Sequence, residues 1–312
     1  MTPRIVLAGN NLAAVYALDI ILDALAPEAL LVLAPTRTGR PDWQTSLADH
    51  ARTRGVATLT PDDVNAPEVL KAVEAHAPDL LLSVYYTQLF RALLDVMRGR
   101  HALNFHPSLL PRHRGVAPLI WAIAEGDAKV GLTVHHIDAD VDAGRIVVQR
   151  PLPIHRDDTG FSLHMKMAKL VRALTAELLR AYLDSGAVTD GVEQEGEASY
   201  HSHGDPVLNH IDWRAPRERV RNVVRALAPP LPGAYANVHH ERLVIARVEP
   251  ADRSDRAVER PPGMVELVRG QPPRIWAGDG PVALVEYFHE GELRPGEELA
   301  SSGRLAEGQL LT

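Results

Sequence analysis

The first part of the chain alternates between short apolar runs and longer stretches with helical spacing. Such runs predict buried strands, and the stretches between them predict helices. The predicted strands cover residues 4–8, 30–33, 55–59 and 79–84, and the predicted helices cover 12–25, 43–54 and 67–76. Strands that alternate with helices are typical of a mostly parallel, doubly wound α/β sheet. Ligands of such sheets bind beyond the carboxyl ends of the strands.

The second part of the chain has a different pattern. Residues 131–137 and 145–149 predict two strands that flank a loop, and apolar positions from Leu163 to Leu183 predict a long helix. Residues 185–205 lack periodicity and predict a linker. Beyond it we expect a helix at 217–227, a proline-rich break at 229–233, and strands at 234–238, 243–248, 264–268, 273–277 and 283–288. We therefore expect two domains, residues 1–190 and 205–312, the second a small barrel or sandwich.

The composition excludes several classes of site. The chain of 312 residues contains no cysteine, which excludes disulfides, thiolate zinc sites and cysteine nucleophiles. It has no apolar run long enough to span a bilayer, and its opening residues do not resemble a signal peptide, so we expect a cytoplasmic protein. The net charge is −7, and residues from 190 onward include 14 basic and 20 acidic side chains. This balance argues against a surface that binds nucleic-acid phosphates.

The first turn is a candidate dinucleotide site, but its pattern is weak. Gly9 is the only glycine where the dinucleotide-binding fingerprint needs three. We interpret the stretch as a strand-to-helix turn in which Asn10 or Asn11 caps the following helix.

Three polar side chains between residues 103 and 142 suggest a chemical function. Asn104 and His106 lie two residues apart at a predicted strand end, so their side chains share a face. An amide can donate to an oxyanion, and an imidazole can move a proton near neutral pH. Asp142, before Ala143-Gly144, could orient the imidazole. This set suits acyl transfer to an amine, although spacing alone leaves open a surface histidine, a turn-forming asparagine and an ordinary turn.

The residues around this set resemble a known family. Asn104 to Pro118 read NFHPSLLPRHRGVAP, and Gly126-Asp127 and Asp142-Ala143-Gly144 follow. This pattern is similar to that of the formyltransferases that use N10-formyltetrahydrofolate. The similarity extends over nearly the whole chain. Within the family it is closest to the amino-sugar formyltransferases, of the type that acts on UDP-4-amino-4-deoxy-L-arabinose.

The resemblance implies a Rossmann-like amino-terminal domain and a smaller carboxyl-terminal β domain that is barrel-like (OB-like). It implies catalytic roles for Asn104, His106 and Asp142. It also implies that the reduced folate binds as a co-substrate, without a metal, along Gln88, Leu89, Phe90, Ser108, Leu109, Leu110, Pro111, Asp138, Ala139, Asp140 and Val141. The expected partner is a primary amine, that of an amino-sugar nucleotide, and a homodimer is compatible with the family.

Four other functions share parts of this pattern. Methionyl-tRNA formyltransferase has the same fold and chemistry, but it needs a basic surface for tRNA that the acidic carboxyl-terminal part does not offer. Formylation of a small natural-product amine and hydrolysis of the formyl-folate use the same three side chains. A folate- or nucleotide-binding protein without activity is disfavoured by the presence of all three.

Overall fold

The structure is a computed structural model that describes residues 2–35, 45–202, 208–239, 241–252 and 259–312. Its contacts form two compact units. Unit 1 comprises residues 1–118, 130–153 and 165–201, and unit 2 comprises 119–129, 154–164 and 202–312. Two short segments of the predicted first domain thus belong to unit 2. The domain boundary between residues 190 and 205 remains a prediction.

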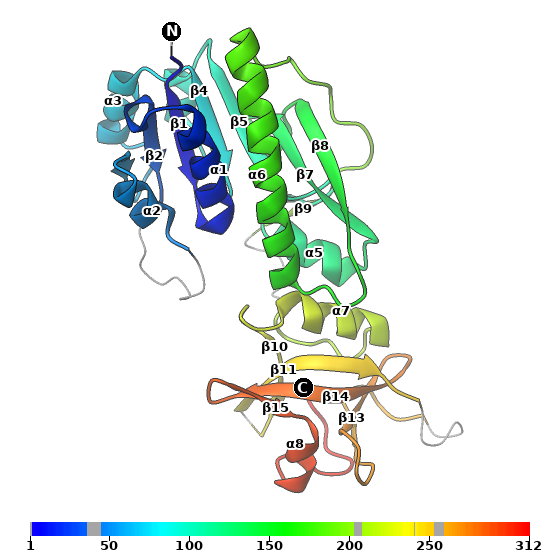
Figure 1. Cartoon of the computed structure of the whole chain (residues 1–312). Coiled ribbons are helices and arrows are strands. Elements are labelled where there is room, and N and C mark those ends of the chain that lie inside the picture. Colours follow the sequence, from blue (N-terminus) through cyan, green and yellow to red (C-terminus); the bar gives the residue numbers. More distant parts are fainter. Residues whose placement is uncertain (1, 36–44, 203–207, 240, 253–258) are drawn as a thin grey trace. The chain divides into compact units, whose positions relative to one another are not determined.

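Unit 1 is built on one seven-stranded sheet (Figure 1). Its strand order is β3-β2-β1-β4-β5-β7-β8. The strands are β1 (Ile5–Gly9), β2 (Leu30–Leu33), β3 (Ala57–Leu59), β4 (Leu80–Val84), β5 (His101–His106), β7 (Lys129–His136) and β8 (Ile146–Pro153). β1 to β5 pair in parallel, and β7 runs antiparallel to β5. The predicted mostly parallel α/β sheet is confirmed.

Helices cover both faces of this sheet. The helices of the first part of the chain are α1 (Asn11–Ala24), α2 (Leu47–Thr53), α3 (Pro67–His76), α4 (Ala92–Val96) and α6 (Gly160–Ser185), with a 3-10 turn at Pro27–Ala29. A further helix, α5 (Pro118–Glu125), belongs almost wholly to unit 2. Val69 and Val73 of α3 pack with Val6 and Leu31 of the strands in one buried cluster. Figure 1 shows α1 and α6 together on a face of the sheet, and the guanidinium carbon of Arg172 lies 5.9 Å from the ring centre of Tyr16. None of the described helices is long and apolar enough to cross a bilayer.

The helix after β1 begins one residue before its predicted start. Asn11, and not Asn10, supplies the cap: its Oδ1 accepts the N–H of Ala13 at 3.1 Å. α3 and β2 match their predicted bounds. The predicted helix 43–54 is shorter, because α2 begins at Leu47, and residues 43–44 lie outside the described residues.

The predicted linker is wrong for residues 189–201, which pack against unit 1. β9 (Tyr200–His201) pairs in parallel with β6 (Arg114–Gly115), and Val192 bridges Ile146. Arg145 also donates to the carbonyl oxygens of Asp190 and Gly191, at 2.9 Å each. These contacts are polar and largely made by the backbone, so they leave no periodic apolar signal in the sequence.

Unit 2 contains a smaller antiparallel sheet, with the order β10-β11-β14-β13-β12 and with β15 beside β14. Its elements are α7 (Arg217–Leu227), β10 (Ala234–Val238), β11 (Glu241–Pro250), β12 (Val265–Glu266), β13 (Arg274–Ala277), β14 (Gly280–His289), β15 (Glu292–Pro295) and α8 (Glu297–Ser301). Residues 308–312 join the two edge strands. Thr312 O accepts from Asn237 N of β10 at 2.6 Å, and Gln309 O accepts from Val265 N of β12 at 2.8 Å. The sheet is therefore closed in a barrel-like way, as predicted.

Candidate active site

The carboxyl end of β5 presents two of the predicted catalytic side chains. Leu103 and Phe105 are buried, and the side chains of Asn104 and His106 share the other face of the strand. The antiparallel register of β5 and β7 places Asn104 opposite His135. His106 lies one step further along the same face, and its ring centre is 6.5 Å from that of His135.

The Asp142 carboxylate connects these groups. Its Oδ1 accepts from Asn104 Nδ2 at 3.2 Å, and its Oδ2 accepts from the backbone N–H of Gly115 at 2.8 Å. Its oxygens lie 3.4 Å from His106 Nδ1 and 3.4 Å from His135 Nε2. The structure thus brings together the three residues that were predicted from the sequence, and adds His135 as a fourth.

Two glycines allow the backbone to approach this carboxylate. Gly144 lies against the carbonyl oxygen of His136, and a Cβ atom at Gly144 would overlap that oxygen. Gly115 has a φ of +87°, and a Cβ atom there would overlap the carbonyl oxygen of His201. Both positions therefore require glycine, one to admit the Asp142 turn and the other to direct an N–H at the carboxylate.

The electrostatics of the site favour an ionised Asp142 and a neutral His106. Burial alone would raise the pKa of Asp142, but the positive charge that His106 carries once protonated, the neighbouring His135 ring and the N–H of Gly115 lower it to about 2. Burial lowers the pKa of His106, and the nearby Asp142 charge opposes this shift without cancelling it. The site therefore combines a permanent negative charge with a proton acceptor near neutral pH.

The hydrogen bonds also determine which nitrogen of each histidine carries a proton. His106 Nε2 lies 2.8 Å from the carbonyl oxygen of His113, which can only accept, so Nε2 carries the proton and Nδ1 is the basic atom facing Asp142. By the same reasoning His135 Nδ1 donates to the oxygen of His136 at 2.8 Å, and its Nε2 accepts from Asn104 Nδ2 at 3.1 Å. A second proton on His106 would therefore lie directly against a carboxylate.

The predicted folate residues after β4 occupy two kinds of environment. Gln88 is engaged within the fold, because its Oε1 accepts from Val64 N at 2.7 Å and its Nε2 donates to Pro61 O at 3.1 Å. Leu89 is 53% exposed, and the ring of Phe90 stacks on that of Tyr86 with centres 5.5 Å apart. Leu89 therefore offers free apolar surface, while Gln88 shapes the loop.

The predicted folate residues Ser108, Leu109, Leu110 and Pro111 form a turn that is fixed by hydrogen bonds to neighbouring residues. Ser108 is buried, and its Oγ donates to Arg112 O at 2.7 Å. Thr133 Oγ1 donates to Ser108 O at 2.7 Å, and Gln149 Nε2 donates to Leu110 O at 3.0 Å. In this conformation the turn supports the end of β5, and a role in folate binding remains a prediction.

The loop formed by Asp138, Ala139, Asp140 and Val141 is exposed. Ile137, just before this loop, packs against the buried cluster that Tyr86 and Phe90 also contact. Val141 is 39% exposed. The two predicted folate segments with free surface therefore both adjoin residues that pack against this buried cluster.

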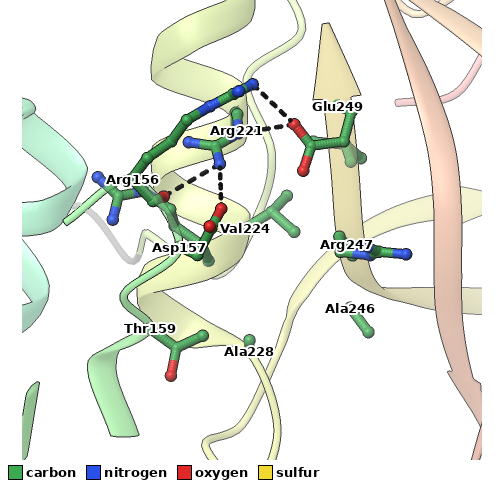
Figure 2. A pocket seen from close by; sticks show the side chains of 11 residues that line it. Arg156, Asp157, Thr159, Arg221, Val224, Ala228, Ala246, Arg247 and Glu249 are labelled. Atoms are coloured by element: carbon green, nitrogen blue, oxygen red, sulfur yellow. Dashed lines mark hydrogen bonds and ion pairs between the residues drawn. The ribbon is translucent and has the colours of Figure 1, made fainter. Parts of the chain in front are cut away.

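A second group of charged residues surrounds a cavity of about 160 Å³ in unit 2 (Figure 2). Arg221 of α7 is buried and donates to Glu249 Oε2 at 3.1 Å, to Arg156 O at 3.0 Å and to Asp157 Oδ1 at 3.5 Å. Because this guanidinium is already bound by three acceptors, we interpret the group as a structural network that joins residues 154–164 to α7 and β11.

The chain matches two protein-family models over most of its length. Residues 33–179 match the model described as formyl transferase, and residues 206–302 match the model described as formyl transferase, carboxyl-terminal domain.

Several solved structures share the fold. One is an N-formyltransferase from Helicobacter canadensis in complex with folinic acid and dTDP-3-aminofucose, with a TM-score of 0.69, 20% identity, and coverage of 92% of this chain and 100% of that one. Another is WlaRD, a sugar 3N-formyltransferase with dTDP and 5-N-formyl-tetrahydrofolate, with a TM-score of 0.69, 21% identity, and coverage of 93% and 99%.

A methionyl-tRNA formyltransferase from Clostridium thermocellum also has this fold, with a TM-score of 0.57, 18% identity, and coverage of 80% and 94%. At these identities the likeness concerns the fold, and it does not distinguish a sugar from a tRNA as acceptor.

Proposed function

The chain belongs to the formyltransferase family, and on this basis we propose that it transfers the formyl group of N10-formyltetrahydrofolate to the primary amine of a nucleotide-linked amino sugar. The observation that carries this proposal is the cluster of Asn104, His106 and Asp142 at the end of β5. An amide donor, a basic nitrogen and a buried carboxylate are groups that suit formyl transfer to an amine.

Each side chain has a defined part in the proposed reaction. The amine nitrogen bonds to the formyl carbon while the bond from that carbon to N10 breaks, and one proton passes from the amine to N10. His106 accepts this proton at Nδ1, where Asp142 stabilises the imidazolium, and then donates it to N10. Asn104 Nδ2 now donates to His135 Nε2 and to Asp142 Oδ1. In the reaction it gives up one of these two hydrogen bonds and donates instead to the formyl oxygen, which gains negative charge.

Two exposed apolar side chains support the folate part of the proposal. Val141 precedes Asp142, and Leu89 precedes Phe90, which packs against the same buried cluster as Ile137. The solved structure from Helicobacter canadensis is a complex with folinic acid and dTDP-3-aminofucose, and that of WlaRD was determined in the presence of dTDP and 5-N-formyl-tetrahydrofolate. By analogy we assign N10-formyltetrahydrofolate as co-substrate and an amino-sugar nucleotide as acceptor.

The choice of acceptor rests on charge. The part of the chain from residue 190 onward has 20 acidic and 14 basic side chains. A tRNA acceptor stem needs broad phosphate neutralisation, whereas a sugar nucleotide has only a diphosphate to bind. We therefore place methionyl-tRNA second among the candidate acceptors.

A panel of acceptors tests the proposal. The wild-type protein is incubated with N10-formyltetrahydrofolate and, in separate reactions, with dTDP- and UDP-linked 3-amino and 4-amino sugars, with methionyl-tRNA, and with buffer alone. Mass spectrometry measures N-formyl product, and an enzymatic assay measures free formate. We expect N-formylation of an amino-sugar nucleotide. Formylated methionyl-tRNA, or formate with no N-formylated amine, would contradict the proposed acceptor.

A further inference from the structure

One side chain outside the proposed catalytic set holds the turn that carries Asp142. Gln194 Nε2 donates to the carbonyl oxygen of Asp142 at 2.8 Å and to that of Gly144 at 2.8 Å. Its Oε1 accepts from Arg114, from Nη2 at 2.7 Å and from Nε at 3.2 Å. The amide group of Gln194 therefore joins two segments that approach Asp142 from different parts of the chain.

The second of these segments supplies a hydrogen bond to the carboxylate. Gly115 follows Arg114, and its N–H donates to Asp142 Oδ2 at 2.8 Å. The backbone here is held by residues just beyond Gln194, because Arg114 N donates to Ser199 O at 2.9 Å. Residues 194–201 thus hold both the turn that carries the carboxylate and the donor that orients it.

The backbone conformation of Asp142 shows why the turn needs such support. Its φ of +52° is in the left-handed region, which costs a residue with a Cβ atom roughly 1 kcal/mol. Such a conformation persists where the surroundings enforce it. The two carbonyl groups that Gln194 binds lie on either side of Ala143, so a single amide fixes the peptide planes that follow Asp142.

Gln194 is not needed to attach its own segment to the sheet. Arg145 Nη1 donates to Glu193, and Arg145 also donates to the carbonyl oxygens of Asp190 and Gly191. Val192 exchanges two backbone hydrogen bonds with Ile146, at 2.7 and 2.9 Å. These bonds hold the segment before residue 194, so the bonds of Gln194 to the Asp142 turn serve the turn itself.

We propose that Gln194 is a positioning residue that keeps Asp142 in the left-handed conformation from which its carboxylate reaches His106 and His135. The proposal rests on the proposed formyl transfer and deepens it. Gln194 acts through Asp142 and is not expected to touch substrate.

Two variants and one control test this role. Gln194→Leu keeps a similar size but removes both donors. Gln194→Glu keeps an acceptor for Arg114 but places an oxygen against the carbonyl groups of Asp142 and Gly144. Glu193→Gln is the control, because it changes the adjacent side chain, which is exposed and pairs with Arg145. Circular dichroism and unfolding midpoints establish that each variant is folded, and if Gln194→Leu does not fold, Gln194→Glu alone decides.

Activity and the titration of His106 are measured in each protein. We expect both Gln194 variants to lose roughly 10- to 100-fold in kcat, because a small shift of the Asp142 carboxylate disturbs the geometry that the reaction needs. The KM for the folate should change little. The NMR titration of His106, assigned by comparison with His106→Asn, should move to lower pH. Burial lowers the pKa of His106, whereas the Asp142 charge and, to a smaller extent, the hydrogen bond to the His113 carbonyl raise it. Of these groups only Asp142 would move away in the variants. The control should match the wild type in both measurements.

Two results would overturn the proposal. One is wild-type kcat in both Gln194 variants, and the other is a loss of kcat with an unchanged His106 titration, which would indicate a purely structural role. If the wild-type protein shows no formyl transfer, the proposed function fails, but the NMR titration still decides whether Gln194 positions Asp142.

Discussion

At the scale of single residues, the carboxylate of Asp142 is the group toward which the other polar side chains of the site are directed. Asn104 and His135 contact one of its oxygens, and His106 and the N–H of Gly115 contact the other. With a pKa of about 2, Asp142 is ionised at every pH at which activity would be assayed. Its charge makes Nδ1 of His106 the natural place for a transferred proton.

The pH dependence of activity follows from the environment of His106. Burial lowers its pKa from the ordinary value of 6.5, and only the neutral imidazole can accept the proton of the amine. As the pH falls through the lowered pKa, His106 becomes protonated and activity is lost. We therefore expect the acid limb of kcat/KM to have its midpoint below 6.5. A midpoint above 6.5, or a rate that stays unchanged down to the lowest pH at which the protein is folded, would contradict a base at this position.

At the scale of elements, the site depends on the short connection between β7 and β8. Gly144 lies against the carbonyl oxygen of His136, and His136 N donates to Arg145 O at 2.9 Å. A side chain at Gly144 must displace this backbone. Gly144→Ala should therefore lower the free energy of unfolding by roughly 1–3 kcal/mol and reduce kcat, because the Asp142 turn shifts with it.

Gly186→Ala provides the comparison for Gly144→Ala. Gly186 has a φ of +71° but nothing within 4 Å of an added Cβ atom, so the change costs only backbone strain, about 1 kcal/mol, and should not affect kcat. Urea unfolding and steady-state rates measure both variants. Equal stability and equal kcat in the two would show that the close approach at Gly144 does not matter.

The sequence predicts regular elements well where apolar spacing and breaks coincide. α3, α7 and β10 match their predicted ranges. β6 and β9 were not predicted, because each has two residues and they pair segments more than 80 residues apart. α8 and β15 were missed because the stretch from residue 290 is rich in glycine and glutamate and has weak periodicity. Short elements formed by tertiary pairing leave no local signal.

The same limit applies to the site. Asn104, His106 and Asp142 could be predicted from residue type, spacing and family resemblance. His135 could not, because the pattern of residues 131–137 predicts a strand but not its partner, and only the register of β7 against β5 places His135 opposite Asn104. Gln194 lies in a stretch without periodicity. Its role follows from the fold, which brings it to Gly144 and Asp142, 50 and 52 positions earlier in the chain.

At the scale of the whole molecule, charge separates the two leading acceptors. The part of the chain from residue 190 onward is net acidic, with 20 acidic and 14 basic residues. We therefore expect fluorescence anisotropy to show no salt-dependent binding of methionyl-tRNA to the wild-type protein at physiological ionic strength. An amino-sugar nucleotide should bind under the same conditions. Tight tRNA binding that weakens steeply with added salt would favour the tRNA formyltransferase alternative.

The most direct test of the proposed chemistry is the turnover of Asp142→Asn. This change keeps the shape of the side chain and removes the charge that supports His106. The wild-type and variant proteins are compared with N10-formyltetrahydrofolate and the accepted amine, with N-formyl product counted by mass spectrometry and folding checked by circular dichroism. We expect kcat to fall by about 10²- to 10⁴-fold in a folded variant. A folded Asp142→Asn protein with wild-type turnover would contradict the assignment of this site.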